Sequence, residues 1–475
     1  MRQFWLTLST ALVLTGCQTL DFGPGPTEIV TEVPDAPEND WTEYAADELP
    51  NVDWVGGFED PVLAQLVAEA LENNTSIRAA RALHDAAIAR VDISDADKLP
   101  FVSGSAGLTR TQFGFELFKD NHGVPDAGFT NARSSLGIDA SWEPDVWGRI
   151  SDQITSSKLD ASAAQADYAG ARLAITSQIS QTWFNLIEAR LLMELAARDV
   201  ETQERALRLT QRRFESGVAG SSDVRLARSS VANSQALEAS RKQQVAALTR
   251  TLETLLRRYP ADAIEAAADL PALPTLEGAG LPAQMLARRP DLLAAERRLK
   301  QQGLSVDVAR KALLPRLSLS GGINSSGNGF SSLFDLDSVV ANLVGGLTQP
   351  LFDGGALKAN VRQQDALLRR SAENYAGTVL DAYREVENAL DAEQRLAERE
   401  SALRVSLDEA VMAEDRLERR YVEGLASILQ LLDAQSRRFS AESQLISART
   451  ERLNNRVRLH VALGGGIYGD ESQGF

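Results

Sequence analysis

The sequence predicts a mainly α-helical protein that also carries membrane β-strands and has an internal two-fold repeat. Two long stretches, Ser151 to Phe214 and Lys358 to Tyr421, contain no proline and only one glycine each. Four shorter stretches alternate apolar and polar residues instead. Landmarks of the first half recur in the second half in the same order. We therefore expect two long helical hairpins, each preceded by a pair of strands.

Matched motifs in the two halves support the repeat. NNTSIRAARA resembles RRPDLLAAER, and an LP dipeptide follows each; both pairs lie 215 residues apart. WEPDVWGR and TQPLFDGG come next, with Pro144 and Pro350 206 residues apart, and Gly217 and Gly424 keep a spacing of 207 residues. Alanine-rich helices can resemble one another by chance, but four landmarks in one order favour a duplicated unit.

Each half follows one plan: a moderate helix, two strands, a very long helix, a glycine break and a returning helix. A helix of roughly 60 residues would extend about 90–100 Å, which is typical of coiled coils and tubes. We expect these boundaries: signal peptide 1–16, extended lipidated segment 17–60, first repeat 61–260 with strands within 99–143, linker 261–281, second repeat 282–463 with strands within 314–349, and a flexible tail 464–475.

The predicted strands have one apolar and one polar face. They are Leu99 to Arg110, Ser134 to Trp142, Leu314 to Asn324 and Val339 to Leu347, and the face opposite the apolar residues carries Ser, Thr, Asn and Asp. This alternation is typical of a membrane barrel, although two surface hairpins of a soluble protein would show it too. Four strands cannot close a barrel, and open edges cannot face lipid. If the strands span a membrane, several chains must share one barrel, and three copies would supply twelve strands.

The N-terminus indicates export and lipid attachment. Arg2 precedes a short apolar region that is typical of a secretory signal rather than a spanning helix. This region ends in Leu14-Thr15-Gly16-Cys17, which resembles a bacterial lipobox and makes Cys17 the expected lipidation site. Gln18 at the next position indicates the outer membrane. Cys17 is the only cysteine, so no disulfide can form within a chain.

Several function classes are disfavoured. The net charge of −17 argues against a nucleic-acid partner. The three histidines lie far apart, so we expect no metal site, and no phosphate-binding loop or nucleophile–base pattern suggests an enzyme or a cofactor. The excess acid is either spread over solvated helix faces or concentrated in an acidic lumen.

The lipobox, RRPDLLAAERRL, the two LP dipeptides, TQPLFDGG and RYVEGLASILQLLDAQ together resemble the TolC-like outer membrane efflux protein family, and most closely its lipoprotein, NodT-type branch. The resemblance covers essentially the whole mature chain. It implies a homotrimer in which a periplasmic α-barrel continues into a twelve-strand β-barrel with four strands per chain. It also implies that the protein lies in the outer membrane, where it is lipid-anchored, spans the membrane as a β-barrel and contacts the membrane lipids.

The resemblance implies a passive efflux channel without catalytic residues or cofactors, supplied by a periplasmic adaptor (membrane fusion protein) and an inner-membrane pump of the RND type. A type I secretion exit duct of the same fold is an alternative. A periplasmic coiled-coil scaffold lipoprotein without a pore is the rival from another class, and the four alternating strands argue against it.

The resemblance also assigns site residues. It places a periplasmic gate at Leu429, Asp433 and Tyr421. It places the hairpin tips and adaptor contacts at Phe214, Gly217, Ser221, Asp223, Gly424 and Leu425. Glycine suits such reversals because it tolerates positive φ. Three copies of Asp433 would form an acidic ring that favours cations, whereas an ordinary solvated carboxylate is the plainer interpretation. Ser436 stands where the family often has Arg, so a gating contact from that position is not expected here.

Overall fold

The computed structural model describes residues 54–113, 129–275 and 287–465. The expected signal peptide, Cys17, most of the extended segment, the end of the linker and most of the tail lie outside the described residues. The chain divides into two compact units. The described part of the first unit covers 88–113, 129–160 and 298–373, and that of the second covers 54–87, 161–275, 287–297 and 374–465.

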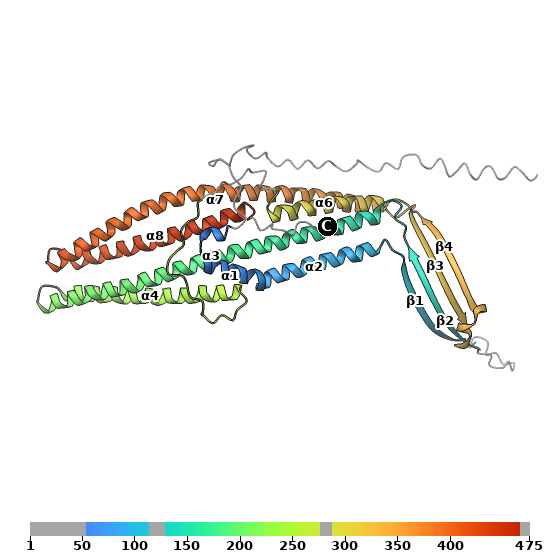
Figure 1. The fold of residues 1–475 in the computed structure, drawn as a ribbon, viewed down its shortest axis with the longest axis horizontal. Coiled ribbons are helices and arrows are strands. Elements are labelled where there is room, and N and C mark those ends of the chain that lie inside the picture. The colour runs from blue at the N-terminus through green and yellow to red at the C-terminus, as the bar shows by residue number, and fades with distance from the viewer. Residues whose placement is uncertain (1–53, 114–128, 276–286, 466–475) are drawn as a thin grey trace, which may run out of the picture. The chain divides into compact units, whose positions relative to one another are not determined.

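Helices dominate the described chain, and four strands form one sheet (Figure 1). The helices are α1 (Pro61–Asn73), α2 (Thr75–Ala96), α3 (Arg149–Glu215), α4 (Ser221–Leu255), α6 (Pro290–Lys311), α7 (Ala356–Val422) and α8 (Ile428–Ala462), with short 3-10 turns at Gly56–Phe58, Ser331–Phe334 and Leu336–Ser338. The strands are β1 (Phe101–Phe113), β2 (Phe129–Trp142), β3 (Arg316–Gly327) and β4 (Val339–Thr348). Within these residues, no helix is both long enough and apolar enough to cross a membrane.

The matching helices of the two halves of the chain have the same lengths. Helices α3 and α7 both contain 67 residues, and α4 and α8 both contain 35. Helices α2 and α6 both contain 22 residues. Each element after the strands recurs 207 residues later, and α2 and β1 recur 215 residues later. The predicted internal repeat is therefore confirmed.

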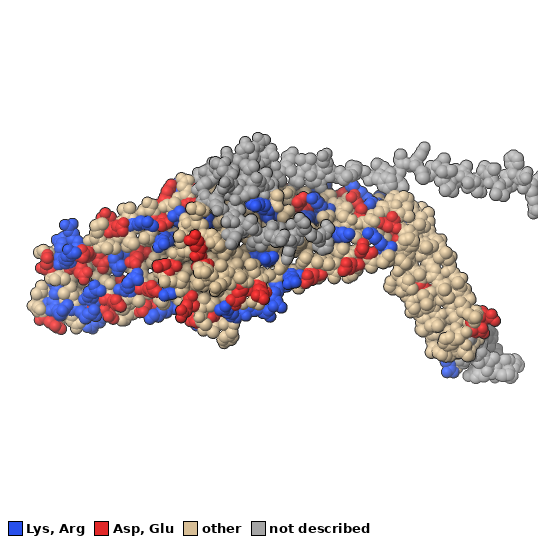
Figure 2. All heavy atoms as spheres, viewed as in Figure 1, with Lys and Arg blue, Asp and Glu red and all other residues tan. Residues whose placement is uncertain are grey.

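The sheet has the order β1-β2-β3-β4, and all its neighbours are antiparallel. The register pairs Ala106 with Leu136, and Leu317 with Leu347, so the predicted apolar residues share one face. On the other face Ser103, Asp139, Gly322 and Asn342 form one row across the four strands. In Figure 2 the visible surface of the sheet is almost uncharged, whereas the helices carry many charges. Strands β1 and β2 extend beyond the predicted ends, because backbone pairing continues from Arg110–Ala132 to Phe113–Phe129.

The second unit has its main core around Trp183 of α3. Trp183 is fully buried and its Nε1 donates to Asp60 Oδ2 at 2.7 Å. The other Asp60 oxygen caps α1 by accepting from the backbone N–H groups of Val62 and Leu63. The core includes Phe58 and Phe184, whose rings lie 5.1 Å apart, and Leu252 of α4 and Val457 of α8. One tryptophan therefore joins the cap of α1 to the longest helix of the first repeat.

His460 closes one side of this core. Its ring stacks on Trp54 with 5.6 Å between ring centroids. Burial, with the nearby Arg456 guanidinium, lowers the pKa of His460 to about 4. The imidazole is therefore neutral near pH 7 and packs as an aromatic ring.

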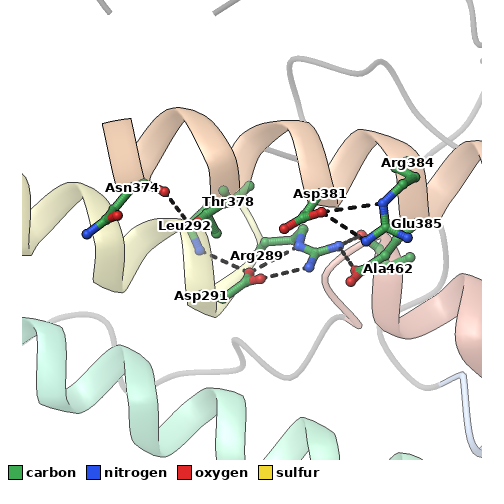
Figure 3. Close-up of polar contacts among 9 residues, drawn as sticks. All are labelled: Arg289, Asp291, Leu292, Asn374, Thr378, Asp381, Arg384, Glu385 and Ala462. Carbon is green, nitrogen blue, oxygen red and sulfur yellow. Dashed lines mark hydrogen bonds and ion pairs between the residues drawn. The ribbon is translucent and has the colours of Figure 1, made fainter. Parts of the chain in front are cut away.

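A buried arginine from the RRPD motif joins α6, α7 and α8 (Figure 3). The Arg289 guanidinium contacts both oxygens of Asp291, at 3.0 and 2.7 Å, and Glu385 at 2.8 Å. It also donates to the carbonyl oxygen of Ala462, at the end of α8, at 3.1 Å. Burial opposes its charge, but the hydrogen bonds with Asp291 and Glu385 raise the pKa of Arg289. The motif thus has a structural role.

Candidate functional site

The α3–α4 turn is a sharp reversal at Gly217. Gly217 has a φ of 75°, its N–H donates to Phe214 O at 2.9 Å, and the N–H of Val218 donates to Arg213 O at 2.9 Å. This pair of bonds satisfies the last carbonyl groups of α3 and requires the left-handed conformation that glycine adopts without strain.

The α7–α8 turn repeats that geometry at Gly424. Gly424 has a φ of 81°, its N–H donates to Tyr421 O at 3.1 Å, and the N–H of Leu425 donates to Arg420 O at 2.8 Å. The returning helices start differently. Ser427 and Gln430 cap α8 reciprocally, at 3.3 and 2.9 Å, whereas Asp223 accepts from the N–H of Gly220 at 3.3 Å before α4.

Tyr421 lies between the two hairpins rather than on an open surface. Its side chain is buried, and its hydroxyl lies 2.8 Å from Thr210 Oγ1 of α3. The Arg213 guanidinium lies 4.8 Å from the centroid of the Tyr421 ring and also donates to the Tyr421 carbonyl. Thr210 and Arg213 were not found by sequence reasoning. Thr210 had no signal, because Leu417 occupies its position in the second repeat.

Leu429 and Asp433 lie one turn apart on α8, and both are exposed. Asp433 Oδ2 accepts from Arg437 Nε at 2.8 Å, and this hydrogen bond raises the pKa of Arg437. The next arginine, Arg438, turns inward instead and pairs with Glu414 of α7 and Glu442 of α8. Asp433 therefore has an arginine partner, Arg437, directly after Ser436.

The remaining predicted tip residues occupy the same two turns. Phe214 and Leu425 expose their apolar side chains, and Ser221 begins α4 at the surface. The structure brings together no three His, Cys, Asp or Glu side chains in a metal-binding arrangement, as far as the described ranges extend.

The sequence matches a known protein family. The sequence profile of the family described as outer membrane efflux protein matches residues 66–256 and 281–465. The chain belongs to the outer membrane efflux protein family. The two matched segments contain both hairpins and both strand pairs of this efflux protein.

Individual relatives match more than nine-tenths of the efflux protein. The antibiotic efflux pump outer membrane protein ArpC of Pseudomonas putida is 30% identical over 98% of this chain and 96% of its own. SilC of Salmonella typhimurium, described as a probable outer membrane lipoprotein, is 25% identical over 97% and 98% of the two chains. The solved outer-membrane channel OprN superposes with a TM-score of 0.82 at 29% identity, covering 92% of this chain and 98% of its own. The predicted family, fold class, efflux function and outer membrane location are confirmed.

Proposed function

We propose that this efflux protein works as a homotrimer, the passive outer membrane channel of a tripartite system. The observation that carries the proposal is the four-stranded sheet with one apolar face and two open edges. Strands β1 and β4 each pair on one side only, within the described residues. An open edge in lipid leaves unpaired backbone groups, so β4 of one copy must pair with β1 of the next.

Three copies of this sheet supply twelve strands, an even number within the range of bacterial barrels. The exposed apolar residues then face lipid, and the row of Ser103, Asp139 and Asn342 faces the lumen. The efflux protein needs no catalytic residue for this role, because the inner-membrane pump supplies the energy.

We further propose that the two glycine turns face a periplasmic adaptor and an RND-type pump. Exposed Phe214 and Leu425 at these turns supply apolar contact area. The relatives' description as efflux pump components supports this assignment.

For the gate, we propose that Leu429 narrows the periplasmic entrance and that Asp433 makes it favour cations. Planar bilayers with purified trimer should show discrete, cation-preferring conductance. Asp433→Ala removes the carboxylate and leaves Arg437 unpaired. We therefore expect a higher conductance and a reversal potential shifted toward the equilibrium potential of the anion. Bilayer recordings under a salt gradient measure both quantities.

Arg437→Ala is the matched control and should shift the reversal potential in the opposite direction, because it leaves Asp433 unpaired. The double variant Asp433→Ala/Arg437→Ala should fall between the two. If none of these variants changes conductance or selectivity in intact trimers, the gate assignment is wrong. If correctly assembled wild-type trimers never conduct, the channel function itself is refuted.

The lipid anchor is a separate proposal and rests on the lipobox that ends at Cys17. Acyl chains contribute roughly 0.8 kcal/mol per buried methylene, so several chains hold a protein at a membrane surface. In cells labelled with palmitate, the wild-type chain should incorporate label and Cys17→Ser should not. Label that persists in Cys17→Ser would show acylation elsewhere.

A further inference from the structure

The turn between β4 and α7 displays two apolar side chains to solvent. Leu351 is 94% exposed and Phe352 is 92% exposed, more than the other large apolar side chains of the described residues. Burying one such side chain contributes roughly 1.5–3 kcal/mol, so this exposure is costly for a lone chain.

The backbone of this turn is held in place by hydrogen bonds on both sides of the apolar pair. Gln349 Nε2 donates to Leu313 O at 3.0 Å. The Asp353 carboxylate accepts from the N–H groups of Gly355 and Leu357 at 2.8 and 2.7 Å. These two N–H groups lower the pKa of Asp353. Leu351 and Phe352 are therefore presented on an ordered turn at the start of α7.

The equivalent turn in the first repeat shows what such a turn packs against. Between β2 and α3, Trp147 Nε1 donates to Pro315 O at 2.6 Å, at the start of the neighbouring strand β3. Asp152 of α3 also pairs with Lys311 just before that strand. Leu314 and Pro315 are half-buried in this contact. A turn that follows one strand thus covers the LP dipeptide that begins the next strand.

Among the described residues, no turn that follows a strand covers the LP dipeptide of the first repeat in this way. Leu99 is 68% exposed and Phe101 is 70% exposed, because β1 is an edge strand. At the positions of Lys311 and Asp152, the other repeat has Ala96 and Ala359. The ion pair seen inside the chain has no counterpart there, and small apolar side chains replace it.

We propose that the Leu351–Phe352 turn of one copy packs on Leu99, Pro100 and Phe101 of the neighbouring copy in the trimer. The proposal rests on the β4–β1 closure proposed above. Strands β1 and β4 form the two opposite edges of the sheet and run in opposite directions, so the end of β4 and the start of β1 lie at the same end of the strands. Antiparallel pairing of β4 with β1 of the next copy brings the Leu351–Phe352 turn close to Leu99–Phe101. The resulting contact would resemble the one within the chain between Trp147 and Pro315.

Paired cysteines test this contact between copies, which we call the seam. The double variant Leu99→Cys/Phe352→Cys is oxidised as assembled protein in detergent and run on a non-reducing gel. A disulfide forms only where Cα atoms approach within roughly 4.4–6.8 Å, and a short bismaleimide covers a small shift in register. In the oxidised sample we expect covalently linked dimers and trimers, and these should disappear when the sample is reduced.

Each single cysteine variant controls for bonds to Cys17, the only native cysteine. Leu99→Cys/Leu336→Cys is the matched control pair. Leu336 is also exposed but lies just before the start of β4, and the length of that strand places it roughly 30 Å from the Leu351–Phe352 turn. Neither control should give linked oligomers. A second pair, Phe101→Cys/Leu351→Cys, tests the same contact in a neighbouring register. If this pair and Leu99→Cys/Phe352→Cys both fail to link by disulfide or bismaleimide while trimers still form and conduct, the proposed contact is wrong and the channel function stands. A wild-type chain that forms no trimer refutes the function and the seam together.

Discussion

Trp183→Ala is expected to destabilise the helical unit by about 3–5 kcal/mol, the range for truncating a large buried aromatic residue. Trp183 is fully buried, and its indole N–H also binds the Asp60 carboxylate that caps α1. The substitution leaves a cavity among Phe58, Phe184 and Leu252 and frees Asp60 from its partner on α3. Urea unfolding of the detergent-solubilised protein, followed by far-ultraviolet circular dichroism, measures the loss.

Trp183→Phe separates the two contributions. It retains most of the apolar volume but removes the N–H donor to Asp60, so we expect a loss of about 1.5–3 kcal/mol, typical of a hydrogen bond to a charged group. Asp60→Asn should give a loss of similar origin. A Trp183→Ala protein as stable as the wild type would show that this core does not hold α1 on α3.

The second large effect is expected at Arg289. Arg289→Ala should cost about 2–4 kcal/mol, because it removes a buried cation that contacts Asp291, Glu385 and the carbonyl oxygen of Ala462 together. The two carboxylates are partly exposed and can regain water, which keeps the loss below that for a fully buried pair. The Ala462 carbonyl loses its charged donor at the end of α8. The same urea unfolding experiment measures the change.

Arg384→Ala is the matched control from the same region (Figure 3). Arg384 is exposed and pairs with exposed Asp381 three residues earlier at 2.9 Å, so its removal should cost no more than about 0.5 kcal/mol. Arg289→Lys should be intermediate, because an ammonium group cannot reproduce the paired bonds to Asp291. Equal losses in Arg289→Ala and Arg384→Ala would show that burial does not strengthen the Arg289 contacts.

The helical hairpins and the strand faces were predictable because both signals are local. Long stretches without proline mark α3 and α7, and strict alternation marks which residues of β1–β4 share a face. Strand ends were less predictable. Residues 111–113 continue β1 because residues 129–131 pair with them, and both segments lie outside the alternating stretches that predicted the strands.

The candidate gate residues show the same limit. Leu429 and Asp433 share an exposed side of α8, as their helical spacing predicts. Tyr421 is buried between hairpins, because Thr210 and Arg213 of the other repeat contact it. A tyrosine at a helix end suits either position, and its own neighbours in the sequence do not distinguish them.

The amino-acid sequence by itself determined the duplicated plan, the glycine reversals and the two-faced strands, because period, spacing and backbone freedom are properties of short segments. Tertiary structure alone decided which charged and aromatic side chains are covered. Arg289 is buried because three helices meet around it, and Leu351 and Phe352 are exposed because β4 is the last strand of its sheet. Burial depends on contacts between segments far apart in the sequence, whereas periodicity depends only on the next few residues.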